Sequence, residues 1–227
     1  MTWRRPSSGL LLAAPMRIEA RLVSSGARRS EVHRTGMGPR NAMQAAQQLA
    51  ALPGEALFVV GFCGALHSGL RPGQVVVADR VYTAQDEGHR HTEVACGRCE
   101  GVVRALREDG FAVDVGPIVS VAKLALGGRR EELHRDGASA VDMESAWLAA
   151  GAGGRPFAVV RVVLDTPEQE LLRARMIPAA IRAGDVLRRV ARSIEEAAER
   201  LGLPTLFAAG VSAGATGRLR GAEREVR

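Results

Sequence analysis

The sequence predicts an α/β domain built on a largely parallel or mixed sheet. Short apolar runs alternate along the chain with stretches of helical periodicity, a pattern typical of successive strand and helix units. Glycine and proline residues separate these runs, as they do at the ends of strands and helices. The chain has 227 residues, 46% of them hydrophobic and 25% charged, which is enough for one domain with a packed core.

The first half of the chain contains apolar runs that we expect to form strands at residues 9–14, 31–35, 56–60 and 74–82. A helix is predicted from Pro39 to about Leu52, because proline is common in the first turn of a helix and Pro53 ends the periodic stretch. Residues 61–73 are rich in glycine, so we expect a loop there.

The second half is predicted to hold strands at residues 111–121, 139–143 and 157–164. Residues 85–97 are polar and expected to be irregular, and a helix should follow them to about residue 108. Another helix is expected directly after the 139–143 strand. The last long helix carries an apolar stripe at spacings of three to four residues, formed by Leu187, Val190, Ile194, Ala197 and Leu201.

We expect one domain over residues 10–204, because no linker or internal repeat interrupts this pattern. Residues 1–9 are expected to be disordered or extended. Residues 205–227 are rich in Gly, Ala and Arg and have no periodicity, which is typical of a flexible tail.

The net charge of +6 raises the question of nucleic-acid binding. Lys123 is the only lysine among 31 basic residues, and the arginines are dispersed and mixed with glutamates, as in the run Arg129–Glu132. One tyrosine, two tryptophans and five phenylalanines offer little surface for base stacking. These features argue against a nucleic-acid partner.

Apolar runs and cysteine usage indicate a cytoplasmic protein. No run approaches the roughly 18 apolar residues that a membrane-spanning helix requires. The run Leu10–Ala14 is too short for the core of a signal peptide, so export is not expected. Three cysteines cannot build a disulfide framework and fit a reducing compartment.

Polar or glycine residues follow several of the predicted strands. In open α/β sheets, ligands bind outside the carboxyl ends of the strands, so these positions are candidates for a site. Each segment alone is also explained as a turn or a helix cap. The segments are Pro15–Glu19, Gly61–Ala65, Asp142–Ser145 and Asp165–Pro167.

The amino-acid sequences of these segments, and their order along the chain, resemble those of a known family. The segments that match are Ala14–Glu19 (APMRIE), Thr35–Gly38 (TGMG), Val60–Leu66 (VGFCGAL), Val141–Ser145 (VDMES) and Arg161–Asp165 (RVVLD). Over about residues 10–200 the chain resembles the superfamily of purine nucleoside phosphorylase and methylthioadenosine/S-adenosylhomocysteine nucleosidase. The amino-acid sequence around Thr35 and Phe62 is most similar to that of the hopanoid-associated phosphorylase branch. The resemblance implies a three-layer α/β/α fold with a central mixed sheet.

The resemblance implies cleavage of the N-glycosidic bond of an adenosine-type nucleoside. Asp165 matches the residue that protonates the departing base, a role worth about 10²–10⁴ in rate. Glu144 matches the glutamate that accepts hydrogen bonds from the ribose hydroxyls, and Met143 matches the methionine packed against the sugar. The remaining substrate-binding positions that the resemblance assigns are Phe62, Cys63, Gly64, Leu124 and Ala125.

The attacking group can be assigned in two ways. Glu19 matches the glutamate that activates water in the nucleosidases, whereas Arg17 lies near the position of a phosphate-binding arginine in the phosphorylases. Val59 and Phe62 stand where phosphorylases tend to have an arginine and a serine, and apolar side chains bind phosphate poorly. This favours hydrolysis. Phosphorolysis of the same bond, as of adenosyl-hopane with inorganic phosphate as co-substrate, and a non-catalytic nucleoside-binding protein are the alternatives.

No organic cofactor or metal is implied. His89, His91, Cys96 and Cys99 form an H-x-H-x₄-C-x₂-C arrangement that offers a possible zinc site, although its spacing is not that of a familiar zinc motif. The expected ligand is a small nucleoside. A homodimer or higher homo-oligomer is expected, because sites of the family are often completed by a neighbouring subunit.

Overall fold

The computed structural model describes residues 9–84, 92–97, 99–168 and 177–208, and these residues form one mixed sheet covered by helices. The strand order is β2-β1-β3-β7-β6-β4-β5, with β8 paired to both β3 and β4. The strands are β1 (Leu10–Ala14), β2 (Glu31–Arg34), β3 (Ala56–Ala65), β4 (Val75–Thr83), β5 (Glu93–Ala95), β6 (Val113–Ser120), β7 (Ala140–Asp142) and β8 (Phe157–Asp165).

The sheet combines parallel and antiparallel pairs, and part of it closes on itself. β1 pairs in parallel with β2 and β3, β3 with β8, and β6 with β4 and β7. Antiparallel pairs join β3 to β7, β4 to β8 and β4 to β5. The pairs β3–β7–β6–β4–β8–β3 therefore close a ring. Because β1, β3 and β8 run in the same direction, their carboxyl ends lie at the same end of the sheet.

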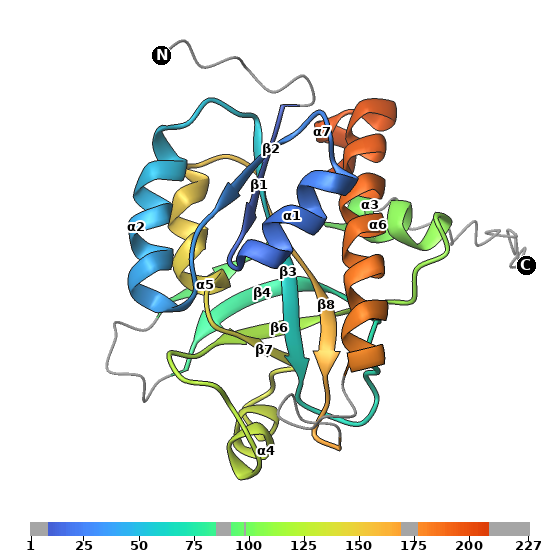
Figure 1. The fold of residues 1–227 in the computed structure, drawn as a ribbon. Coiled ribbons are helices and arrows are strands. Elements are labelled where there is room, and N and C mark those ends of the chain that lie inside the picture. The colour runs from blue at the N-terminus through green and yellow to red at the C-terminus, as the bar shows by residue number, and fades with distance from the viewer. Residues whose placement is uncertain (1–8, 85–91, 98, 169–176, 209–227) are drawn as a thin grey trace, which may run out of the picture.

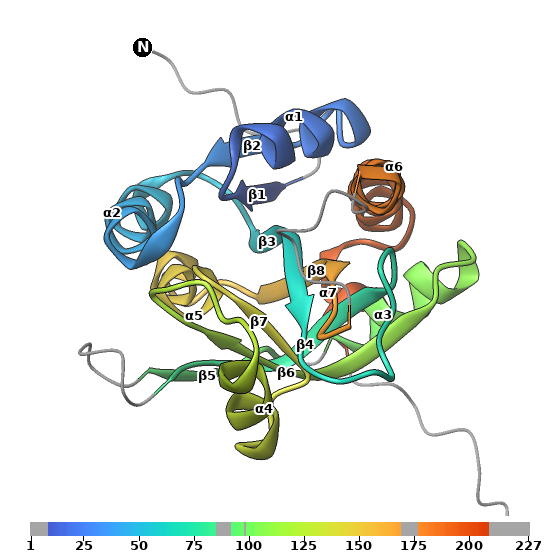
Figure 2. The same cartoon turned by 60° about the horizontal axis from the view of Figure 1, so that its bottom comes forward.

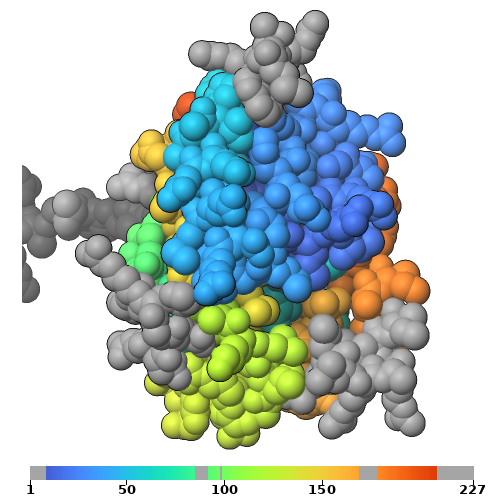
Figure 3. Space-filling view, turned by 60° about the vertical axis from the view of Figure 1, so that its left-hand side comes forward, coloured from blue at the N-terminus to red at the C-terminus, as the bar shows by residue number. Residues whose placement is uncertain are grey.

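Helices cover this sheet on two sides, as Figures 1 and 2 show. The helices are α1 (Arg17–Gly26), α2 (Gly38–Ala51), α3 (Glu100–Glu108), α4 (Gly128–Arg135), α5 (Ser145–Leu148), the 3-10 helix η1 (Ala149–Ala152), α6 (Ile177–Leu201) and α7 (Leu203–Leu206). α1 packs on α6, and α2 packs on α5 and η1. α4 extends from the lower end of the molecule in Figure 1, and Figure 3 shows its yellow-green surface below the blue surface of α2. The predicted three-layer α/β/α fold is confirmed.

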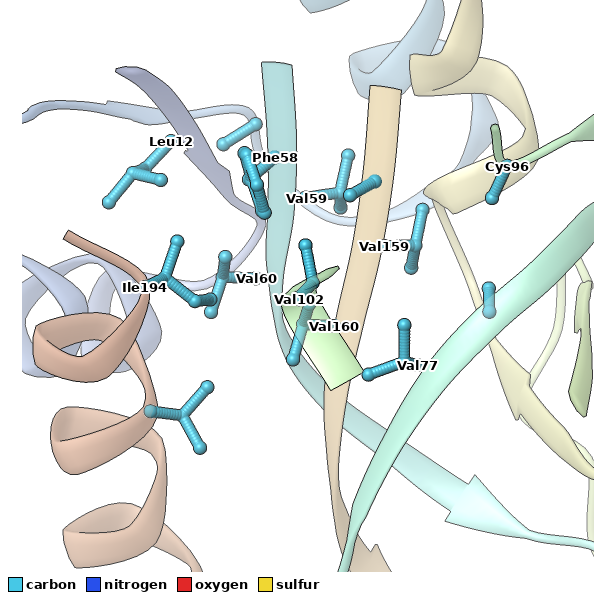
Figure 4. Close-up of a cluster of buried hydrophobic side chains, with 14 of the residues drawn as sticks. Leu12, Phe58, Val59, Val60, Val77, Cys96, Val102, Val159, Val160 and Ile194 are labelled. Carbon is cyan, nitrogen blue, oxygen red and sulfur yellow. The ribbon is translucent and has the colours of Figure 1, made fainter. Parts of the chain in front are cut away.

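The core lies between the sheet and its helices. Every residue of β1 is buried, and β3 and β8 are buried over nearly their whole length, because strands covered on both faces need apolar side chains on both. Figure 4 shows Phe58 and Val60 of β3, Val159 of β8 and Ile194 of α6 in this cluster. The stripe predicted on the last helix is confirmed, since its members from Leu187 to Ala197 are buried.

Two local predictions are wrong. β3 continues through Gly61–Ala65, where a loop is expected from the glycines. Glycine is needed there because neighbouring side chains occupy the space of a β-carbon: a Cβ on Gly61 would lie 2.5 Å from Arg161 Nη1. The region expected to be irregular contains β5, which pairs with β4.

Helices α1 and α4 are not expected from the sequence. α4 is almost entirely polar, and Arg130 and Leu133 are its only buried residues, so it has no clear apolar stripe. The expected segments 1–9 and 205–227 fall largely outside the described residues, although α7 reaches Leu206, which is buried. Among the described helices, none is both long and apolar enough to cross a membrane.

Candidate functional site

A cavity of about 160 Å³ opens at the carboxyl ends of β1, β3 and β8. Its walls come from the turn after β1, the end of β3, the segments before α2 and α4, the β7–α5 turn and the end of β8. The residues that line it are Pro15, Met16, Glu19, Met37, Phe62, Cys63, Gly64, Leu124, Val141, Asp142, Met143, Glu144, Leu164 and Asp165. The position is the one expected for a ligand site in a fold of this kind.

Glu19 is an oriented, buried carboxylate in the first turn of α1. Its Oε2 accepts a hydrogen bond from the Met16 amide at 2.6 Å, and its Oε1 accepts one from the Phe62 amide at 2.7 Å. The side chain is 1% exposed. Burial raises the pKa of the Glu19 carboxyl, while the Arg161 cation and the two amides act in the opposite direction. A carboxylate in this setting is suited to accept a proton.

Arg161 is a fully buried cation in the middle of β8. Its Nη2 lies 2.6 Å from Asp142 Oδ2 and 3.8 Å from Glu144 Oε2. Burial lowers the pKa of the guanidinium, but the surrounding carboxylates outweigh burial and the pKa is raised, so the group stays charged. Its Nη1 has no hydrogen-bond partner among the described residues.

Asp142 stabilises the turn that contains Glu144. Asp142 Oδ1 accepts hydrogen bonds from Ser120 Oγ at 2.6 Å and from the Glu144 and Ser145 amides at 3.2 Å each, and Oδ2 accepts one from Ser145 Oγ. Glu144 Oε1 in turn accepts a hydrogen bond from the Gly38 amide at 3.0 Å. Burial, together with the Asp142 charge, raises the pKa of Glu144 to about 7.

Asp165 lies at the other side of the cavity and is paired with Arg130. Arg130 Nη2 is 2.5 Å from Asp165 Oδ2, and the side chains are 2% and 3% exposed. The other guanidinium nitrogens of Arg130 donate to the Ala125 carbonyl at 2.9 Å and the Ala65 carbonyl at 3.2 Å. A Cβ on Gly64 would lie 2.9 Å from Asp165 Oδ1, so the carboxylate needs glycine at that position.

The carboxylates of Glu19 and Asp165 lie against different residues of β3. Glu19 is bonded to Phe62, whereas Asp165 pairs with Gly64 past an irregularity in the β3–β8 register. At about 3.3 Å per residue along a strand, these two backbone positions of β3 are about 7 Å apart, so Glu19 and Asp165 meet different parts of the cavity wall.

Most of the site residues predicted from the sequence line the cavity, but not all of them do. Arg17 is exposed on the first turn of α1 and does not line it. Ala125 is buried behind the lining, with its carbonyl bonded to Arg130. Cys63 lines the cavity, and burial raises the pKa of its thiol far above the ordinary value, so it stays protonated. Met37, just before α2, and Leu124, in the segment before α4, are 54% and 50% exposed and form an apolar rim of the cavity.

The possible zinc site cannot be assembled from the described residues. His89 and His91 lie outside them, while Cys96 and Cys99 are buried thiols. Within the described part of the chain, no group of three or more His, Cys, Asp or Glu side chains is placed to hold a metal ion.

Arg161 and Arg130 are functional candidates that the sequence analysis misses. Arg161 interrupts the apolar run of β8, and a charge inside such a run is a usable signal for a buried polar site. Arg130 gives no such signal, because it stands among charged neighbours and is read as part of an exposed face, whereas it is 1% exposed.

Comparisons with known proteins identify the family and the fold. The family model described as phosphorylase superfamily matches residues 22–194. No curated protein matches the sequence. Among solved structures, the S-adenosylhomocysteine nucleosidase of Streptococcus pyogenes, in complex with 5-methylthiotubericidin, is 20% identical, with a TM-score of 0.67 over 82% of this chain and 96% of that one.

Two further structures share the fold. The methylthioadenosine/S-adenosylhomocysteine nucleosidase of Campylobacter jejuni is 14% identical, with a TM-score of 0.71 over 84% of this chain and 98% of that one. The futalosine hydrolase of Helicobacter pylori is 16% identical, with a TM-score of 0.64 over 84% and 95% of the two chains.

Proposed function

This chain belongs to the phosphorylase superfamily, and we propose that it hydrolyses the N-glycosidic bond of an adenosine-type nucleoside and releases adenine. The observation that carries the proposal is Glu19, a buried carboxylate that lines the cavity and is held in place by two backbone amides. The nucleosidases and the futalosine hydrolase of the same fold support cleavage of this type of bond.

In the proposed reaction, a water attacks C1′ of the ribose from the side of Glu19. Glu19 accepts the proton that the water loses, and the positive charge of Arg161 favours the ionised form of Glu19 before the attack. Glu144 accepts hydrogen bonds from the ribose hydroxyls, and its negative charge stabilises the positive charge that develops on the sugar. Met143, which lines the cavity beside Glu144, packs against the sugar.

Asp165 acts on the base in this proposal. As the C1′–N9 bond breaks, its electron pair moves into the base, and Asp165 transfers a proton to N7 so that adenine leaves as a neutral molecule. Once the proton has moved to N7, Asp165 is a carboxylate and accepts a hydrogen bond from the 6-amino group of adenine. A 6-oxo group would then place two acceptors against each other, so this arrangement favours adenine over hypoxanthine.

The charges around the cavity favour water over phosphate. A phosphate bound near Glu19 would face two buried carboxyl groups, Glu19 and Glu144, and like charges at short range are strongly unfavourable in a buried site. Arg17, the cation expected for a phosphorylase, is exposed and away from the lining. Phosphorolysis, including that of adenosyl-hopane, would therefore need cations in addition to Arg161, for example from a second subunit of a homodimer.

The apolar rim supports a hydrophobic group at the 5′ position of the nucleoside. Met37, Leu124 and Phe62 provide apolar surface at the mouth of the cavity, which suits a methylthio or lipid substituent better than a free hydroxyl.

The proposal is tested with purified protein and a panel of nucleosides, with the released base identified by chromatography. The panel consists of 5′-methylthioadenosine, adenosine, an adenosyl-lipid analogue and inosine. We expect adenine release that is faster from the 5′-apolar substrates than from adenosine, and little hypoxanthine from inosine. Binding without release of any base would identify a nucleoside-binding protein and contradict the proposal.

A further inference from the structure

Arg130 links three walls of the cavity with one guanidinium group. It contacts Ala125 in the segment before α4, Ala65 at the end of β3 and Asp165 at the end of β8. Ala65 and Asp165 are 65 and 35 residues away from Arg130 in the sequence, and each nitrogen of the guanidinium contacts a different one of the three segments. Arg130 reaches them from α4, a helix that otherwise buries only Leu133.

Packing alone does not account for a charge at this position. Removing a guanidinium from water is unfavourable, and a buried ion pair is often replaceable by apolar side chains of similar volume without loss of stability. Arg130 nevertheless lies 1% exposed beside the carboxylate to which we assign the proton transfer. The feature to be explained is therefore the positive charge, aimed at one oxygen of Asp165.

We propose that Arg130 is a positioning residue for the proton transfer from Asp165 to the base, an inference that rests on the proposed function. When the proton moves from the Asp165 carboxyl to N7 and the C1′–N9 bond breaks, Asp165 becomes a carboxylate. The positive charge of Arg130 stabilises the negative charge that Asp165 acquires in this step. The guanidinium is already in place, so no rearrangement is needed as the charge develops.

The bonds to Ala65 and Ala125 fix where that charge lies. The fork of a guanidinium has a rigid geometry, and here two of its three nitrogens are anchored on backbone carbonyls. The third nitrogen is thereby held against Asp165 Oδ2, and the carboxyl group has one orientation toward the cavity. A lysine would keep the charge but could not make all three contacts.

A double-mutant cycle with adenine release from 5′-methylthioadenosine tests this role. Arg130→Met is measured in the wild-type background and in the Asp165→Asn background. If Arg130 acts through the acid, the substitution lowers kcat/KM at least about 100-fold in the wild type, mainly in kcat, and less than about 3-fold once Asp165 is Asn. Equal losses in both backgrounds, or no loss in the wild type, would overturn the proposal.

Arg130→Lys covers the case in which Arg130→Met does not fold, because the lysine does not leave Asp165 without a counter-charge. We expect kcat/KM to fall about tenfold in the wild-type background and not at all with Asn at position 165. Equal effects in both backgrounds would overturn the proposal.

Arg155→Met is the matched control, since Arg155 donates hydrogen bonds to four backbone carbonyls and lies away from the cavity. Its effect on kcat/KM should be the same in both backgrounds. A wild-type protein that releases no base overturns the proposed function itself, whereas active wild type with an additive cycle overturns only the role of Arg130.

Discussion

Arg161 Nη2 lies 2.6 Å from Asp142 Oδ2, and both side chains are almost completely withdrawn from solvent. This pair joins β8 to the end of β7, and the same Asp142 carboxylate accepts hydrogen bonds from the amides of Glu144 and Ser145 in the turn that follows. The sugar side of the cavity therefore depends on one buried ion pair rather than on loop packing alone.

Asp142→Asn should destabilise the protein by about 3–5 kcal/mol, because it leaves a buried arginine with less compensating charge. The free energy of unfolding in urea measures this. Asp185→Asn is the matched control: Asp185 and Arg188 are also 2.6 Å apart but exposed, so we expect a loss of less than about 1 kcal/mol. Similar losses in the two variants would contradict the structural role given to Asp142.

Gly64→Ala should abolish most of the activity while the protein remains folded. The added methyl group would lie 2.9 Å from Asp165 Oδ1 and 3.0 Å from Arg130 Nη2, so the acid must move. We expect kcat/KM for adenine release to fall at least about tenfold, because small displacements of catalytic groups have large effects. Gly128→Ala, where no atom lies within 4 Å of the new methyl group, should stay within about twofold of wild type.

Glu19→Gln should lower the rate of hydrolysis at least about 100-fold, because an amide cannot accept the proton of the attacking water. Arg17→Ala should leave the rate within about twofold, since Arg17 is exposed and outside the lining. Steady-state kinetics with 5′-methylthioadenosine distinguish the two. The reverse pattern, a large loss with Arg17→Ala and none with Glu19→Gln, would assign the attack to phosphate.

The rate should decline as the pH falls through about 7. The pKa of Glu144 is raised to about 7, mainly by burial, and its ionised form is the one that accepts hydrogen bonds from ribose. The expected profile of kcat/KM therefore has an acid limb near pH 7. A rate that is constant between pH 5 and 8 would contradict the role assigned to Glu144.

The free energy of unfolding should change with pH in the direction opposite to that of the rate. The pKa of Glu144 is higher in the folded state than the ordinary value of 4.5, so the folded state binds the proton more tightly. The stability that this group contributes is complete below pH 4.5 and is lost as the pH rises to about 7. Glu144→Gln removes this dependence, so the variant should gain about 2 kcal/mol relative to wild type between pH 5 and pH 8. If the difference in unfolding free energy between Glu144→Gln and wild type is the same at pH 5 and pH 8, the raised pKa assigned to Glu144 is wrong.

Strands and site carboxylates are the parts of the structure that can be predicted from the sequence. Continuous apolar runs such as Ala56–Val60 mark buried strands, and Glu19, Glu144 and Asp165 stand at the strand ends where a ligand is expected. The extension of β3 through Gly61 and Gly64 cannot be predicted this way, because those glycines are required by side chains from β8 and α1 that are distant in sequence.

Arg130 shows a different limit of sequence-based prediction. Its burial results from three acceptors that the fold brings together from separate segments, and none of these contacts leaves a local pattern around residue 130. Its neighbours Arg129 and Glu132 do form an ion pair at the helix surface, as a charged run suggests. Contacts between distant segments, rather than local preference, decide which arginine is buried.

The most direct test of the account is the sugar product formed from 5′-methylthioadenosine with and without inorganic phosphate. Hydrolysis guided by Glu19 predicts free 5-methylthioribose at the same rate in both conditions, with one oxygen from the solvent incorporated at C1 when the reaction is run in ¹⁸O-labelled water. Adenine release that requires phosphate and yields a sugar 1-phosphate would contradict the central claim.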